Sequence, residues 1–192
     1  MKKEMFKDRF SLTQAVIEGR KTMKRVVPKF IIERYNKQYG SMSEPTMMLE
    51  EYLDKHKREY YSIGEEVAVA QSYEDILLSG HKLPKGAKKD FDPANIGYRN
   101  KLYTKAEYMP YRFVVTDIRV ERLQDITDGD CLNEGVVRVL GPQGRYYSVS
   151  GINVKFMTAR EAFAVMYDRI CGKGTWETNP YVFVYSFELI RQ

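Results

Sequence analysis

Cysteine is scarce in this chain of 192 residues. The two cysteines, Cys131 and Cys171, lie far apart and in no C-x-x-C spacing. The sequence therefore predicts neither a disulfide framework nor a cysteine-based zinc site, and a reducing compartment fits it best.

Long apolar runs are also missing. The longest apolar stretch, residues 181–190, has roughly half the length that a helix needs to cross a bilayer. The first residues are charged, and no apolar run of the kind found in secretory leaders follows them. We therefore expect a cytoplasmic protein that is neither secreted nor membrane-spanning and has no membrane partner.

Histidine and the common catalytic signatures are nearly or wholly absent. The only histidines are His56, on the apolar face of a predicted helix, and His81, in a predicted loop. We expect the first to be packed or capping and the second to be solvated. The sequence has no phosphate-binding loop, dinucleotide fingerprint, nucleophile elbow or H-E-x-x-H motif. It therefore predicts no metal site and no cofactor.

Apolar residues are plentiful at 43% of the chain, enough to build one continuous core. We expect a single domain over residues 1–192. Capping boxes at Ser11/Gln14 and Thr158/Glu161 begin two predicted helices, and Gly19 ends the first of them. Periodicity predicts helices at 11–19, 44–60, 127–134 and 158–170, and strands at 23–27, 67–71, 111–122, 137–140, 146–149 and 181–190. Residues 30–39 fit either a helix or a strand because their apolar residues run together, and we prefer the helix. Pro45 suits the first turn of the helix at 44–60, and residues 141–144 predict a hairpin turn between the strands at 137–140 and 146–149.

The strands are mostly short, with helices between them, which indicates an α+β or all-β barrel and not a doubly wound sheet. Residues 181–190 are apolar on both faces and predict a central strand. Residues 111–122 alternate, which places Val114, Thr116, Ile118 and Val120 on one face and Val115, Asp117, Arg119 and Glu121 on the other. Glycine, proline and lysine punctuate residues 79–100, which we expect to form a long loop.

The net charge of +5 gives a mild bias toward polyanionic partners. The cations cluster in two places, at Arg20, Lys21, Lys24, Arg25 and Lys29 and at Lys82, Lys85, Lys88 and Lys89. In the first cluster, the segment E-G-R-K-T follows a predicted helix, so that Arg20, Lys21 and Thr22 emerge together. Such a group can hold a phosphate or a carboxylate. The alternative is a basic surface turn that binds nothing.

Two further residues invite a functional interpretation. Glu134 precedes Gly135 at the end of a short predicted helix, and beside Lys21 it could transfer a proton or orient the edge of a base. Otherwise it is one exposed acid among many. Trp176 could stack on a base, but a turn packed against the core is the more common use of such a residue.

At these residues the chain resembles the ASCH superfamily, and in particular the stand-alone ASCH proteins of bacterial and phage-derived genomes. The matching pieces, in the family's order, are residues 14–25 (QAVIEGRKTMKR), 64–69 (GEEVAV), 109–110 (MP), 115–135 (VTDIRVERLQDITDGDCLNEG) and 160–187 (REAFAVMYDRICGKGTWETNPYVFVYSF). The resemblance implies a PUA-like mixed β-barrel with short flanking helices and a cleft lined by the G-R-K-T turn. It further implies RNA or nucleotide-like ligands, with insertions at about 30–61 and 79–100.

Some small members of this superfamily are amidohydrolases that remove the acetyl group from N4-acetylcytidine with a lysine, a threonine and a glutamate. Lys21 and Glu134 match the lysine and the glutamate. The threonine falls three residues after the lysine, where this chain has Lys24, although Thr22 lies nearby.

Three hypotheses follow. In the first, the chain is a binding module whose phosphate contacts come from Arg20, Lys21, Lys24 and Arg25, with a tyrosine or Trp176 stacking on a base and Glu134 reading a polar edge. In the second, it is a small hydrolase of acylated nucleosides that uses Lys21, Glu134 and Thr22. In the third, it is a protein-interaction domain of a mobile element, with the partner held at the helix of residues 44–60.

Overall fold

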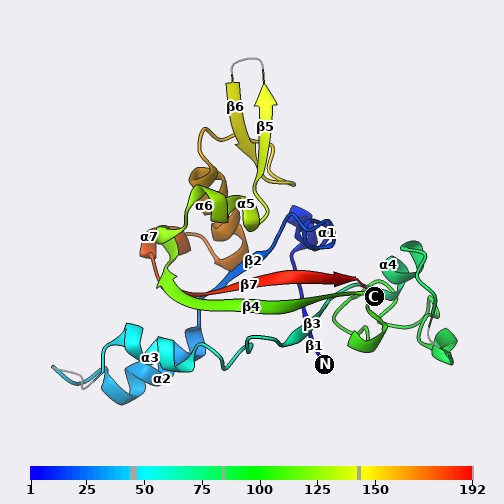
Figure 1. Cartoon of the computed structure of the whole chain (residues 1–192), viewed down its shortest axis with the longest axis horizontal. Coiled ribbons are helices and arrows are strands. Elements are labelled where there is room, and N and C mark those ends of the chain that lie inside the picture. The colour runs from blue at the N-terminus through cyan, green and yellow to red at the C-terminus, as the bar shows by residue number, and fades with distance from the viewer. Residues whose placement is uncertain (44–46, 84, 142–143, 192) are drawn as a thin grey trace.

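The computed structural model describes residues 1–43, 47–83, 85–141 and 144–191, and its centre is a mixed five-stranded sheet. The strands, in spatial order, are β1 (Lys2–Glu4), β3 (Glu66–Val69), β4 (Tyr111–Arg122), β7 (Tyr181–Arg191) and β2 (Met23–Val26). β1 and β3 run parallel, and the other neighbouring strands are antiparallel. With helices on either side of this sheet (Figure 1), the α+β class is confirmed.

β7 lies between β4 and β2, so the prediction of a central final strand is confirmed. Its residues 182–185 are at most 1% exposed, because the strand is covered on both faces. Side chains in and next to β3 alternate between two cores. Val67 and Val69 enter the main core, while Ala68 and Ala70 face a second, smaller core.

The predicted alternation along β4 is wrong beyond its middle. The pairing register with β7 shifts between Val115 and Asp117, as in a β-bulge, and both Val115 and Ile118 are buried in the main core. A bulge inserts one extra residue, so side chains beyond it exchange faces. Ile118 therefore shares its face with Val115 and not, as expected, with Val114.

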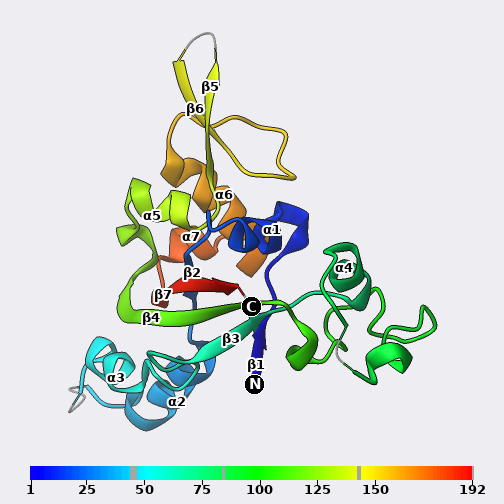
Figure 2. The same ribbon diagram turned by 45° about the vertical axis from the view of Figure 1, so that its right-hand side comes forward.

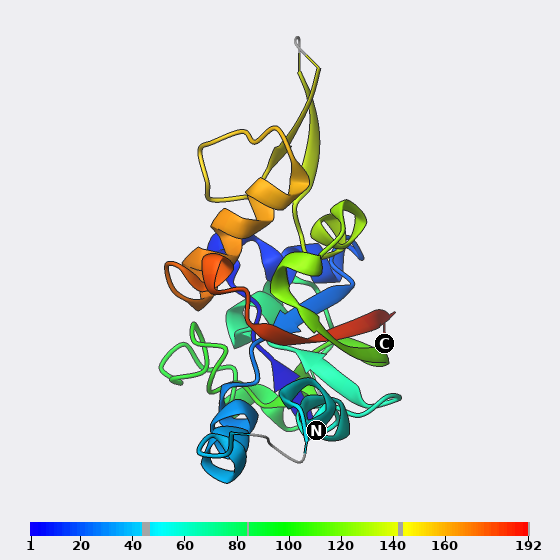
Figure 3. The same cartoon turned by 90° about the vertical axis from the view of Figure 1, so that its left-hand side faces the viewer.

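One side of the sheet carries α1 (Leu12–Ile17), α5 (Asp128–Asn133), α6 (Ala159–Cys171) and α7 (Thr175–Thr178), as Figure 3 shows. The capping box of Thr158 and Glu161 is confirmed at the start of α6, and Thr127 caps α5. The capping box predicted at Ser11 is wrong. Ser11 has a left-handed backbone with φ of 52°, and its side chain makes no cap hydrogen bond.

Two lobes extend from the ends of the sheet (Figure 2). In the first, α2 (Lys29–Tyr39) and α3 (Leu49–His56) pack together, with the rings of Tyr35 and Tyr52 5.4 Å apart. Pro45, predicted in the first turn of this second helix, lies outside the described residues. In the other lobe, α4 (Tyr73–Leu78), which we did not predict from the sequence, packs with the mostly irregular segment 79–100 around the second core.

The predicted hairpin is confirmed. It consists of β5 (Val137–Gly141) and β6 (Gly144–Ser148) and projects away from the sheet (Figures 1 and 3), while its predicted turn at 142–143 lies outside the described residues. Both cysteines are free thiols. Within the described ranges, no helix has the length and apolarity needed to span a bilayer.

Candidate functional site

The turn after α1 directs Lys21 into the protein. Gly19 takes a left-handed backbone with φ of 74°, as predicted, and the next two backbone N–H groups, of Arg20 and Lys21, both donate to Ala15 O at 2.9 and 3.0 Å. This left-handed stop reverses the chain within one turn. The following residue, Thr22, donates its backbone N–H to Asn133 O at 2.9 Å, which ties the turn to the end of α5.

The end of α5 presents Glu134 to the same point. Glu134 is the C-cap residue of that helix, and its backbone N–H donates to Asp130 O at 2.8 Å. Gly135 follows with φ of 109°, a conformation that glycine adopts readily. The chain therefore turns away from the helix immediately after the carboxylate.

Lys21 and Glu134 meet in the interior, although they lie 113 residues apart in the chain. Lys21 Nζ is 2.6 Å from Glu134 Oε2 and also donates to the backbone oxygens of Glu134 and Met23 at 2.9 and 2.7 Å. The two residues are 3% and 4% exposed. Burial lowers the pKa of Lys21 despite the attraction of the Glu134 charge, because removal from water penalises the ammonium form.

Arg25 holds Glu134 from its other side. Its guanidinium lies 3.2 Å from Glu134 Oε1, 2.6 Å from Glu121 Oε1 and 2.8 Å from Asp130 Oδ2. Its burial alone would lower the pKa of Arg25, but the charges and hydrogen bonds of these carboxylates together raise it. Arg119 contacts Glu121 and Asp130 at 2.9 Å each, so the acids and cations form one network.

A small cavity of about 140 Å³, here called the Lys21 cavity, opens beside this pair. The residues that line it are Met5, Phe6, Lys7, Leu12, Lys21, Lys24, Arg25, Glu134, Phe163, Met166, Tyr167 and Ile170. Its walls therefore combine an apolar surface, supplied largely by α6, with a charged end. Lys24 Nζ pairs with Glu4 at 2.5 Å, and Phe6 lies 5.9 Å from the ammonium groups of both lysines.

Three of the predicted site residues lie outside the described wall of this cavity. Arg20 is exposed and pairs with Glu18 at 2.5 Å. Thr22 joins the backbone pairing of β7 through its carbonyl, which accepts from Phe187. Trp176 is half-buried against Phe163, with ring centroids 6.1 Å apart.

We did not predict from the sequence the acids that hold Arg25 and Lys24. Glu121 and Asp130 belong to two different elements, and Glu4 comes from the first strand. The only local signal was the clustering of charges at the end of β4. No spacing rule joins acids from three separate segments.

Within the described part of the chain, no group of three or more metal-binding side chains gathers. His56 packs on Tyr52, as expected, with ring centroids 4.1 Å apart. His81, expected to be solvated, is half-buried and contacts the ring of Tyr111.

Comparison with protein-family models, with curated proteins and with solved structures found no match to this chain.

Proposed function

We propose that the chain is an ASCH-like module that binds RNA or a nucleotide-like ligand at the Lys21 cavity. The observation that carries this proposal is the meeting of Lys21 and Glu134 at the wall of a small, partly apolar hollow. A binding site needs polar groups that converge within a concave surface, and these two do. The finer proposal for the fold is that the sheet and the hairpin correspond to a PUA-like barrel.

The size of the cavity limits what can enter. At about 140 Å³ it is smaller than the roughly 300 Å³ at which pockets for drug-sized ligands begin. Only one part of a nucleotide, such as the base, fits inside. The rings of Phe6 and Tyr167 offer apolar contact, and Glu134 offers an acceptor. Lys21 donates to the ligand by exchanging one of its three hydrogen bonds to Met23 and Glu134.

The phosphates then remain outside, where Arg20 is exposed and Lys24 is half-buried. Arg25 has a different part in this proposal, because its side chain is fully buried among three carboxylates. It positions Glu134 and does not reach the ligand's phosphates. Trp176 packs edge-to-face against Phe163 and has no assigned contact with the ligand.

A specific observation also favours the second candidate function, hydrolysis of an acylated nucleoside. The pKa of Lys21 is lowered by burial, and its ammonium group touches the Glu134 carboxylate. Together they could stabilise a developing oxyanion and move a proton as water adds to the amide carbonyl. Lys24 occupies the position where the resemblance expects a threonine, so this chemistry lacks one of its three parts.

Calorimetric titration with cytidine monophosphate and with a short single-stranded RNA tests the binding proposal. We expect Lys21→Met and Glu134→Gln to weaken binding at least about tenfold, as loss of a hydrogen bond to a charged group does. Glu121→Gln is the matched control, because it removes a partner of Arg25 that does not line the cavity. Absence of binding by the native chain, or equal affinity in all variants, would reject the proposal.

Chromatographic detection of cytidine released from N4-acetylcytidine tests the hydrolase candidate. Turnover that is abolished by Lys21→Met and raised by Lys24→Thr supports it. If neither the native chain nor Lys24→Thr releases cytidine, this candidate is rejected and only the binding function remains.

A further inference from the structure

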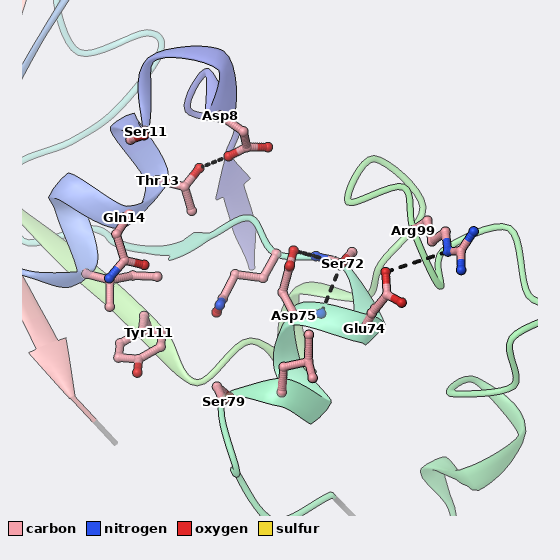
Figure 4. Close-up of a pocket in the computed structure, with 13 residues that line it drawn as sticks. Asp8, Ser11, Thr13, Gln14, Ser72, Glu74, Asp75, Ser79, Arg99 and Tyr111 are labelled. Carbon is pink, nitrogen blue, oxygen red and sulfur yellow. Dashed lines mark hydrogen bonds and ion pairs between the residues drawn. The ribbon is translucent and has the colours of Figure 1, made fainter. Parts of the chain in front are cut away.

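A second and larger hollow lies against the other side of α1. Leu12 contributes to the Lys21 cavity, whereas Thr13, Gln14 and Ile17 of the same helix contribute to this second hollow, here called the polar groove. The groove has a volume of about 700 Å³. Figure 4 shows its polar side chains, which come from α1, from α4, from the start of β4 and from the segment around Arg99.

The groove is lined by Gln71, a buried side chain with a hydrogen-bond acceptor that is unpaired within the described chain. Gln71 lies between β3 and Ser72, the N-cap residue of α4, and is only 5% exposed. Among the described residues, its Oε1 is the one buried side-chain polar atom that has no hydrogen-bond partner. Leaving a buried acceptor unpaired costs about 1–3 kcal/mol, and native proteins rarely do so without a reason. The wall of the groove thus includes a side chain whose buried acceptor no group of the described chain satisfies.

Negative charges outnumber positive charges in the lining of the groove. Three carboxylates line it, those of Asp8, Glu74 and Asp75, against the guanidinium of Arg99. Lys101, from outside the lining, pairs with Asp8 at 2.7 Å, so the negative charge that remains lies at Glu74 and Asp75. Arg99 is itself 82% exposed along its side chain and reaches Glu74 only at 3.7 Å, a loose ion pair (Figure 4). An anionic ligand would meet repulsion here, and a cationic ligand would meet attraction.

The remaining lining groups suit a ligand that donates hydrogen bonds. The Ser72 backbone N–H and hydroxyl both donate to Asp75 Oδ2, at 3.0 and 2.7 Å, and so fix the orientation of this carboxylate. The hydroxyl of Thr13 orients Asp8 in the same way at 2.5 Å. Tyr111, a further lining residue, brings a ring whose face attracts cations.

We propose that the polar groove is a binding site for a small organic cation, one that carries ammonium or guanidinium N–H groups. One N–H donates to Gln71 Oε1, and the positive charge lies near the carboxylates of Glu74 and Asp75. This site is separate from the Lys21 cavity, with which it shares no described lining residue. The proposals for the two sites can therefore be tested independently.

Calorimetric titration of the full chain with agmatine and with spermidine tests this proposal, with ribose and inorganic phosphate as the neutral and anionic probes. We expect both cations to bind at least tenfold more tightly than ribose, and phosphate not to bind. Gln71→Met, which removes the acceptor at similar size, should weaken cation binding about tenfold. Gln71→Glu, which keeps an acceptor and adds a charge, should strengthen it.

A matched pair of variants separates the groove from general attraction to surface acids. Glu74→Gln and Glu51→Gln each remove one helix carboxylate that is paired with a basic residue, Arg99 or Lys55. Only Glu74→Gln should weaken binding, by several-fold. Equal loss in both variants, tighter binding of phosphate or ribose, or no binding of either cation would overturn the proposal. If Gln71→Met fails to fold, as judged by circular dichroism, the comparison of Glu74→Gln with Glu51→Gln still tests the proposal.

Discussion

Two opposing effects act on the protonation of Lys21, its hydrogen bonds and its burial. Three oxygen acceptors surround its ammonium group, which favours the charged form, yet burial still lowers its pKa. A lysine in this state gives up its proton more readily than one in water. This property suits a site that exchanges hydrogen bonds or protons with a ligand.

The lowered pKa of Lys21 predicts how stability changes with pH. Between its folded-state pKa and the ordinary value of 10.5, the unfolded chain binds a proton that the folded chain has released. The free energy of unfolding of the native chain should therefore rise with pH relative to Lys21→Met as the pH approaches 10.5. Urea unfolding at pH 8 and pH 10 measures this difference.

Glu134 remains paired with Arg25 in the Lys21→Met variant, which should therefore still fold. Lys37→Met, which removes an exposed lysine of α2, controls for the loss of one positive charge. A stability difference between the native chain and Lys21→Met that is flat or falls with pH would contradict the interpretation of Lys21.

At the scale of elements, two helix starts with the same sequence pattern behave differently. Thr158 caps α6 reciprocally with Glu161, whereas Ser11 enters α1 directly from a short 3-10 turn (Asp8–Phe10). That turn sets the left-handed backbone of Ser11, and the Ser11 hydroxyl then faces Ser150 at 2.8 Å. The preceding backbone, and not the pattern, decides whether the side chain can cap.

This difference predicts unequal costs of substitution. Thr158→Ala should lower the free energy of unfolding by about 1 kcal/mol, the usual cost of a lost N-cap. For a chain of this length that corresponds to a fall in Tm of roughly 2–4 °C. Ser11→Ala is the matched control and should cost less than half as much. Thermal unfolding followed by circular dichroism checks both, and equal costs would show that the two positions are equivalent.

At the scale of the whole molecule, the net charge of +5 understates how the cations are distributed. Lys21 and Arg25 are buried and neutralised by carboxylates. Cations at the surface, among them Arg20 in the turn after α1 and Arg138 and Arg145 on the hairpin, remain exposed. Long-range attraction to a polyanion therefore depends on these exposed cations and not on the buried network.

Under the proposed function, the affinity for single-stranded RNA should fall as salt rises. The slope of log affinity against log salt is about −0.7 for each phosphate that is neutralised. Arg20→Gln should make this slope shallower by about 0.7, the contribution of one phosphate contact. Arg58→Gln, which removes an exposed arginine beyond α3, should leave it unchanged. Fluorescence anisotropy at several salt concentrations measures the slope, and a slope near zero for the native chain would oppose an interaction with phosphates.

Local sequence patterns by themselves determined most of the elements and half of the candidate site. The strand at β4, the hairpin, the central β7, the cap of α6 and the glycine stop after α1 all follow from interactions between residues a few positions apart. For the same reason Lys21 and Glu134 could be singled out, because each lies within two residues of a glycine that ends a helix.

Only the tertiary structure decided how these parts meet. The bulge in β4, the left-handed Ser11 and the burial of Gln71 each depend on neighbours that are distant in the chain. The pairing of Lys21 with Glu134 spans 113 residues, and the acids that hold Arg25 come from two further positions. A periodic pattern shows which face of an element is apolar, but which charge meets which inside the protein depends on how the elements pack.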